Sequence, residues 1–126
     1  MELTSLLASF KPVVLCIDDD PQALKLRVAV LQRGGFEVLS AEDADDAFQK
    51  FKTYQIDLVL SDHRLKGTTG TEIAKQMKQH KPAIPIVLYS GSPPESMGPV
   101  DCFILKSEEP TIVLERLHSL VRRSKE

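Results

Sequence analysis

Short apolar runs alternate along the chain with longer segments whose apolar residues recur every three or four positions. The apolar runs predict strands at about 13–17, 36–40, 56–61, 84–89 and 102–105. The segments with helical spacing predict helices at about 21–33, 43–54, 70–80 and 109–123. Because the strands are apolar along nearly their whole length, we expect helices on both faces of the sheet. The predicted fold class is therefore α/β, a doubly wound parallel sheet of five strands.

One interval breaks this alternation. Residues 91–101 contain Pro93, Pro94, Gly98 and Pro99. Proline is tolerated in the first turn of a helix but not in its interior, and only residues 95–97 separate Pro94 from Gly98. We therefore expect at most about one helical turn there, so that the helix between the fourth and fifth strands is short or absent.

Polar side chains follow four of the five predicted strands, at the point where each strand ends. They are the triplet Asp18-Asp19-Asp20, then Asp62, the pair Ser90-Gly91, and Lys106. The carboxyl ends of parallel strands meet along one edge of the sheet, where open α/β folds bind their ligands. Carboxylates, a hydroxyl and a lysine together are suited to a divalent cation and a phosphoryl group. Asp20 is the exception, because an aspartate followed by Pro21 is typical of a helix N-cap.

Composition limits the classes of partner. The chain has 16 basic and 18 acidic residues, which gives a net charge of −2 and no global argument for nucleic acid or an anionic membrane. No apolar stretch approaches the ~20 residues that span a bilayer. Residues 1–10 lack the basic start and long apolar core of a signal peptide. We expect a cytoplasmic domain with Cys16 and Cys102 as buried free thiols.

The ordered set of strand-end residues resembles the receiver domain of bacterial two-component response regulators, the CheY-like family. Gly67 and Gly70 after Asp62, and Phe103 three residues before Lys106, add to the likeness. The resemblance covers about residues 12–123. It implies a flavodoxin-like strand order, 2-1-3-4-5, for a domain at 12–126. Residues 1–11 are then an N-terminal extension, which we expect to be partly packed through Leu6, Leu7 or Phe10.

The resemblance implies a phospho-acceptor and a metal site. Asp62 is the expected acceptor, whose carboxylate takes the phosphoryl group of a phosphohistidine. Asp19 and Asp62 are expected to bind Mg²⁺ (or Mn²⁺) directly, Asp18 through a water molecule, and Arg64 through its backbone carbonyl. Mg²⁺ takes oxygen ligands and keeps several waters, so this division of ligands is chemically reasonable.

Further residues are expected to contact the phosphoryl group. By the same resemblance, Lys106 pairs with one phosphoryl oxygen, and the Ser90 hydroxyl, followed by Gly91, binds another. His63 is expected to contribute its backbone N–H. Phe103 stands at the aromatic switch position of the family, although a phenylalanine without a polar group also fits the core.

The sequence departs from the family at three places, which affect the signalling surface more than the residues of the phosphorylation site. The fourth helix is reduced, and in the family it forms part of the usual signalling and dimerisation surface. Ser107 follows the lysine where proline is usual, so we expect a trans Lys106–Ser107 bond. Lys66 also stands where proline is frequent.

The resemblance implies a sensor histidine kinase or a phosphotransfer protein as donor, and a downstream protein as target. We expect no direct contact with nucleic acid or membrane, because no effector domain follows the last predicted helix. Such a domain is not an enzyme beyond slow self-phosphorylation from small donors and slow self-dephosphorylation. One alternative is a phosphorylation-independent interaction module with the same fold. Another is an aspartate-nucleophile phosphohydrolase of the haloacid-dehalogenase type, although Gln22 stands where that motif needs threonine or valine.

Overall fold

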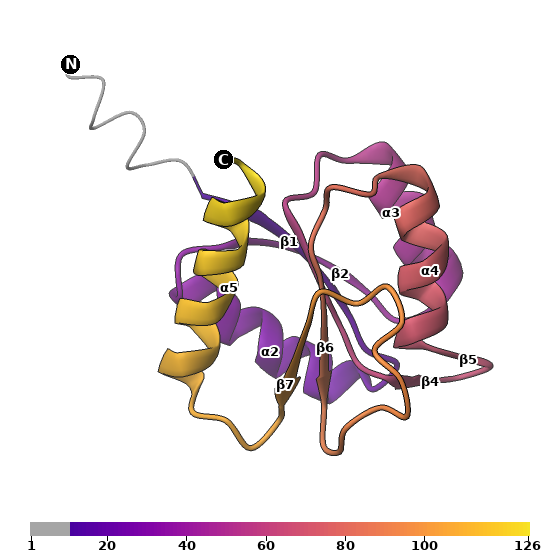
Figure 1. Ribbon diagram of the computed structural model, residues 1–126. Helices are drawn as coiled ribbons and strands as arrows, with labels where there is room; N and C mark the ends of the chain where they lie inside the picture. The colour runs from indigo at the N-terminus through magenta and orange to yellow at the C-terminus, as the bar shows by residue number, and fades with distance from the viewer. Residues whose placement is uncertain (1–10) are drawn as a thin grey trace.

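A sheet of five parallel strands lies at the centre of the computed structural model, which describes residues 11–126 (Figure 1). The strands are β1 (Val13–Ile17), β2 (Glu37–Ala41), β3 (Leu58–Ser61), β6 (Ile86–Ser90) and β7 (Cys102–Leu105). The helices are α2 (Pro21–Arg33), α3 (Ala44–Thr53), α4 (Gly70–His80) and α5 (Pro110–Ser124). Helices α2 and α5 cover one face and α3 and α4 the other. The order β2-β1-β3-β6-β7 confirms the predicted 2-1-3-4-5 arrangement.

The register of the strands decides which residues meet at the edge of the sheet. Ile17 of β1 pairs with Ser61 of β3, so the residues that follow them, Asp18 and Asp62, leave the sheet side by side. The Asp62 backbone N–H donates to the Ile17 carbonyl at 2.9 Å. Because side chains alternate between the faces of a strand, a slip of one residue would separate this pair.

Two apolar clusters form the core, one on each face of the sheet. Leu15 and Ile17 point to the side of α3 and α4, where Phe51 and Met77 are fully buried. Val14 and Cys16 point to the side of α2 and α5. This explains why the sequence shows continuous apolar strands instead of alternation, as expected for a sheet covered on both faces.

Gly70 is required where α4 begins beside the end of β3. A Cβ atom at Gly70 would lie 2.6 Å from the backbone oxygen of Asp62 and 2.5 Å from Cδ2 of Leu88. Neither approach is tolerable, so only glycine lets the helix begin this close to the end of β3. The Gly70 backbone N–H also donates to the His63 carbonyl at 2.7 Å.

Some predicted boundaries were wrong by one or two residues. Strand β3 begins at Leu58 instead of 56, and β6 runs from Ile86 to Ser90 instead of 84–89. A small antiparallel hairpin, β4 (Arg64–Leu65) and β5 (Thr68–Thr69), was not predicted. Its tight turn places Gly67 at φ +76°, which favours glycine.

The predictions for the irregular segment and the last strand had mixed outcomes. Within the described residues, no helix forms between β6 and β7 and no peptide bond is cis, as expected. In the same segment Val100 is buried in the core and Met97 is 37% exposed. Cys16 is buried as predicted, whereas Cys102 is only half-buried, because the first residue of edge strand β7 faces Arg116 of α5.

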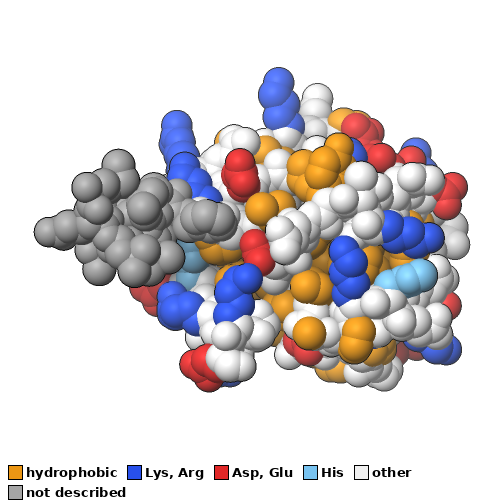
Figure 2. All heavy atoms as spheres, turned by 90° about the horizontal axis from the view of Figure 1, so that it is seen from above, with side chains coloured by type: hydrophobic (Ala, Val, Ile, Leu, Met, Phe, Trp, Pro, Cys, Tyr) orange, Lys and Arg blue, Asp and Glu red, His pale blue; other side chains and the backbone are white. Residues whose placement is uncertain are grey.

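The surface and the termini add little to these assignments. Acidic and basic side chains are interspersed over the face shown in Figure 2. None of the helices in the described residues has the length and apolar character needed to cross a membrane. The predicted packing of Leu6, Leu7 or Phe10 lies outside the described residues.

Candidate functional site

Three carboxylates meet at the edge of the sheet where the strands end. One ligand oxygen each from Asp18, Asp19 and Asp62 lies within 4.8 Å of the others. Asp18 is buried, whereas Asp19 and Asp62 are partly exposed. Negative charges this close repel one another, so the cluster favours cations nearby. The structure thus brings together the three acidic residues that the sequence indicated as metal ligands.

Asp62 is held by one backbone and one side-chain donor. Its Oδ1 accepts a hydrogen bond from the backbone N–H of His63 at 2.8 Å, and its Oδ2 lies 3.2 Å from Nζ of Lys106. The Asp62 side chain is 15% exposed, so solvent and a reagent can reach it. An oriented carboxylate beside a cation is well placed to attack a phosphorus atom, because the lysine offsets the charge that arrives with the phosphoryl group.

The ends of β6 and β7 carry the remaining predicted residues. The Lys106 backbone N–H donates to the Ser90 carbonyl at 2.9 Å. Ser90 is buried and Gly91 is exposed. Phe103 is half-buried and packs against the core cluster on the side of α3 and α4.

Arg64 and Asp20 lie at the margins of the site. Arg64 is exposed at the start of the β4–β5 hairpin, two residues after Asp62. Asp20 is exposed, and its side chain accepts hydrogen bonds from the backbone N–H groups of Gln22 and Ala23. This confirms Asp20 as the N-cap of α2.

Arg27 is the site residue that the sequence reading missed. Its guanidinium donates to Oδ2 of Asp18 at 2.7 Å, and the two side chains are only 13% and 2% exposed. Burial alone lowers the pKa of Arg27, but the hydrogen bond and the negative charge of Asp18 more than offset this effect, and the net pKa is raised. A signal was present in the sequence: Arg27 lies three residues after Leu24, on the inward stripe of a helix that begins at the acidic triplet.

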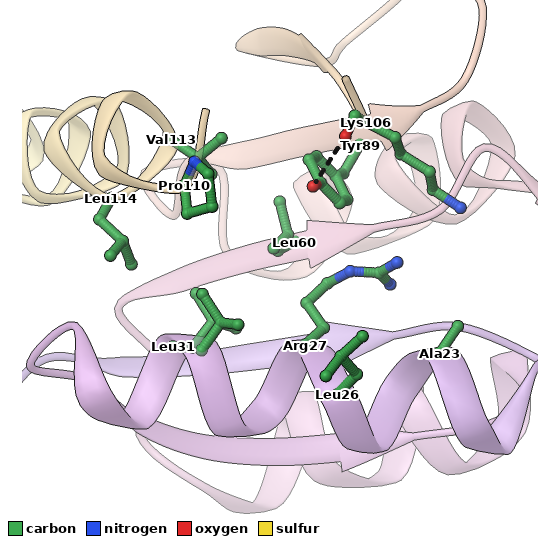
Figure 3. A pocket seen from close by; sticks show the side chains of 11 residues that line it. Ala23, Leu26, Arg27, Leu31, Leu60, Tyr89, Lys106, Pro110, Val113 and Leu114 are labelled. Atoms are coloured by element: carbon green, nitrogen blue, oxygen red, sulfur yellow. Dashed lines mark hydrogen bonds between the residues drawn. The ribbon is translucent and has the colours of Figure 1, made fainter. Parts of the chain in front are cut away.

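The guanidinium of Arg27 also connects the acidic cluster to β6. It lies 4.8 Å from the ring centroid of Tyr89, in cation–π geometry. The Tyr89 hydroxyl donates to the backbone carbonyl of Lys106 at 3.4 Å (Figure 3). Arg27, Tyr89 and Lys106 line one end of a cavity of about 280 Å³ between α2 and α5, and its other walls are mainly apolar.

Cys16, beneath the cluster, is not a nucleophile. Burial raises the pKa of its thiol to about 11, more than Arg27 lowers it. Because the thiolate is the reactive form, Cys16 stays protonated at neutral pH.

The donor set fits a small divalent cation. All three side chains offer carboxylate oxygens, the ligands that Mg²⁺ prefers. Each oxygen of Asp18 already accepts a hydrogen bond, Oδ1 from the Asp20 backbone N–H at 2.9 Å and Oδ2 from Arg27. Both oxygens of Asp62 are engaged as well, by His63 and Lys106, so burial is what sets Asp18 apart. Asp18 is buried, whereas Asp19 and Asp62 are partly exposed and are the more accessible ligands for an incoming cation.

Comparison with known proteins agrees with this geometry. The family model described as the response regulator receiver domain matches residues 14–99. The alkaline phosphatase synthesis transcriptional regulatory protein PhoP of Bacillus subtilis is 30% identical over 118 residues, which cover 88% of this chain and 49% of that protein. ResD of the same organism, also a transcriptional regulatory protein, is 29% identical over 88% of this chain and 48% of its own length. The chain thus spans about half the length of these curated relatives.

Solved structures show the same fold. A CheY-like receiver domain protein from Methanospirillum hungatei superimposes with a TM-score of 0.85 at 23% identity, over 92% of this chain and 98% of that one. The regulator TrrA of Thermotoga maritima, in complex with Mg²⁺ and BeF, gives 0.81 at 27% identity over 86% and 98%. TrrA in complex with the histidine kinase ThkA gives 0.79 at 28% identity over 86% and 97%.

Proposed function

Because the chain belongs to the response regulator receiver domain family, we propose that it accepts a phosphoryl group on Asp62 from a histidine kinase or a phosphotransfer protein. The observation that carries the proposal is the position of the Asp62 carboxylate. It lies within reach of Asp18 and Asp19 on one side and 3.2 Å from Lys106 on the other. The complex of TrrA with a histidine kinase supports this class of donor.

The transfer is a substitution at phosphorus. A carboxylate oxygen of Asp62 forms the new P–O bond while the P–N bond of the phosphohistidine breaks. The electron pair of that bond stays on the imidazole nitrogen, and Asp62 becomes an acyl phosphate. Lys106, which pairs with the Asp62 carboxylate before the transfer, pairs with a phosphoryl oxygen after it. The His63 backbone N–H, already 2.8 Å from Asp62, is the nearest uncharged hydrogen-bond donor to the phosphoryl group.

The metal of this proposal is Mg²⁺, or Mn²⁺ in its place. Asp19 and Asp62 would hold it directly, the Arg64 carbonyl would add a backbone ligand, and Asp18 would hold it through water. A bound divalent cation lowers the repulsion between the carboxylates and the phosphoryl oxygens. The acidic cluster within 4.8 Å and the Mg²⁺ complex of the relative TrrA support this assignment.

Phosphorylation is proposed to act on a protein-binding surface. Ser90 and Gly91 end β6 where the irregular segment 91–101 begins, so a hydrogen bond from the Ser90 hydroxyl to the phosphoryl group pulls on that segment. Phe103 on the neighbouring strand β7 is the proposed aromatic switch residue, whose ring turns inward when the Ser90 hydroxyl moves. The proposed target is a protein, with no direct contact to DNA.

The proposed location is the cytoplasm, because Cys16 and Cys102 are both free thiols and a reducing compartment keeps thiols free.

The test is phosphorylation by a small donor. The protein, incubated with Mg²⁺ and phosphoramidate, should gain the mass of one phosphoryl group in an intact-mass spectrum. Asp62→Asn should abolish the gain, and Asp45→Asn, an exposed aspartate on α3, should not change it. Labelling of Asp62→Asn at the wild-type level would contradict the assignment.

The absent helix between β6 and β7 favours a second candidate, an interaction module that needs no phosphate. If Asp62→Asn binds the target as tightly as the phosphorylated protein does, this second function holds. Rapid multiple turnover of a generic phosphate ester would instead indicate a phosphohydrolase.

A further inference from the structure

The guanidinium of Arg27 contacts both Asp18 of the acidic cluster, at 2.7 Å, and the ring of Tyr89 on β6, at 4.8 Å. Figure 3 shows Arg27 and Tyr89 on facing sides of the cavity. We propose that Arg27 is a built-in counterion that competes with the divalent cation for Asp18 and links occupation of the metal site to Tyr89. The inference rests on the proposed metal site and concerns how tightly that site binds. Arg27 touches neither phosphate nor acceptor, so it is a positioning residue.

The competition follows from the contacts of Asp18. This carboxylate is almost fully buried, and its partner Arg27 is 13% exposed, so water screens the pair only weakly. Arginine does not lose its proton in proteins, so the positive charge is present at every working pH. A cation that shares Asp18 with Arg27 meets a carboxylate whose charge is already largely compensated. The wild-type site must therefore bind Mg²⁺ more weakly than the same three carboxylates would without Arg27.

Removal of Arg27 should raise the affinity for Mg²⁺ for a second reason as well. A neutral residue at position 27 leaves Asp18 as a buried charge without its cationic partner, which is costly in the metal-free protein. A divalent cation relieves that cost when it binds. Both effects act in the same direction, so loss of the arginine should raise the affinity for Mg²⁺.

The connection to β6 is made by the same guanidinium. Its stacking on Tyr89 at 4.8 Å means that any shift of Arg27 relative to Asp18 changes the contact with the ring. The Tyr89 hydroxyl in turn bonds the carbonyl of Lys106. Tyr89 precedes Ser90, so the residue that senses the metal site is covalently adjacent to the residue that binds phosphate in the proposed mechanism.

The chain offers a clean reporter for this contact. It has no tryptophan and two tyrosines, Tyr54 and Tyr89. In a Tyr54→Phe background, the intrinsic fluorescence arises from Tyr89 alone. Mg²⁺ binding is then measured by calorimetry, and the response of Tyr89 is measured in the same titration.

Two substitutions of Arg27 separate charge from stacking. Arg27→Gln removes the charge and should lower the dissociation constant for Mg²⁺ at least tenfold. Arg27→Lys keeps the charge but lacks the planar group that stacks on an aromatic ring. It should bind Mg²⁺ within about threefold of the wild type, while the fluorescence response of Tyr89 falls by at least half. Lys25→Gln removes one charge from an exposed position of the same helix and should change the affinity less than twofold.

The outcomes are distinct. A wild-type protein that binds no Mg²⁺ overturns the proposed metal site itself. A wild type that binds Mg²⁺, with Arg27→Gln equal or weaker, overturns the role of Arg27 and leaves the metal site intact. If Arg27→Gln is unfolded without metal, Mg²⁺ should restore its thermal transition, because a ligand that binds only the folded state stabilises it; no recovery at saturating Mg²⁺ counts against the inference. An unchanged Tyr89 response in Arg27→Lys excludes the link to β6.

Discussion

Nζ of Lys106 lies 3.2 Å from Oδ2 of Asp62, although 44 positions separate the two residues along the chain. The parallel pairing of β3 with β6 and of β6 with β7 brings them together. The pair is only partly exposed, with side-chain exposures of 34% and 15%. The pairing of the strands therefore holds the lysine beside the carboxylate.

Lys106→Met should slow the phosphorylation of Asp62 by roughly 10²-fold, because it removes a positioned cation from the place where charge develops. The initial rate with phosphoramidate, followed by intact mass, measures the effect. Lys75→Met, at an exposed position of α4, is the matched control and should react at the wild-type rate. Equal rates for both variants would show that Lys106 takes no part in the transfer.

Asp19→Ala and Asp20→Ala should affect different properties, metal affinity and stability, although the two residues are neighbours. Asp19→Ala removes a proposed metal ligand, so its affinity for Mg²⁺ should fall sharply. Asp20→Ala removes the N-cap of α2 and should cost about 1 kcal/mol of unfolding free energy, with little change in Mg²⁺ affinity. Calorimetric titration and urea denaturation of both variants decide this. If both lose the same Mg²⁺ affinity, Asp20 is also a ligand.

Gly70→Ala should destabilise the fold by about 1–3 kcal/mol, because the new methyl group overlaps the backbone at Asp62 and the side chain of Leu88. The displaced end of β3 should also slow phosphorylation. Gly91→Ala is the control for stability, since a Cβ atom there meets no atom within 4 Å and its φ is not positive. Thermal denaturation should show a clear loss for the first variant and almost none for the second.

Cys16 should make the protein less stable in alkali. Burial raises the pKa of its thiol from 9.0 to about 11. Between these two values the folded state holds a proton that the unfolded state has lost, so the free energy of unfolding decreases as the pH rises and levels off above about pH 11. Urea denaturation at pH 8 and at pH 10.5 measures the loss. The same pH change should cost Cys16→Ala less than it costs the wild type.

Phosphorylation should not produce the usual dimer of the family, because the segment 91–101 forms no helix. Sedimentation of the beryllofluoride-treated protein should show a monomer, or a dimer formed through another face. A tight dimer whose interface maps to 91–101 and α5 would contradict this expectation.

Most of the fold was predictable from local patterns. Continuous apolar strands, helical spacing and the proline-rich interval sufficed for the layers and for the absent helix. The strand-end residues Asp18, Asp62 and Lys106 could be assigned to one edge because parallel strands share it. Tertiary contacts decided the rest. The salt bridge of Arg27 with Asp18 depends on how α2 packs against β1, and Cys102 is half-buried because α5 covers the edge strand β7 only in part. The spacing places Arg27 on the inward face of α2 but does not identify its partner, and it does not show how much of the edge strand a helix covers.

The irregular segment between β6 and β7 has a thermodynamic consequence. Among the described residues, Val100 and Asp101 alone donate backbone–backbone hydrogen bonds from positions 91–101, to Met97 and Ile86. A helix in this place would move as a rigid body, whereas a chain anchored mainly at one end changes state by gaining or losing order. We predict that a signal sent through this segment is carried by conformational entropy. Amide hydrogen exchange at Ser92 and at residues 95–97, which carry the backbone N–H groups that Pro93 and Pro94 lack, should be fast in the resting protein and slow severalfold in the beryllofluoride complex. Equal exchange rates in both states would show that activation does not order this segment and that the signal is carried by another surface.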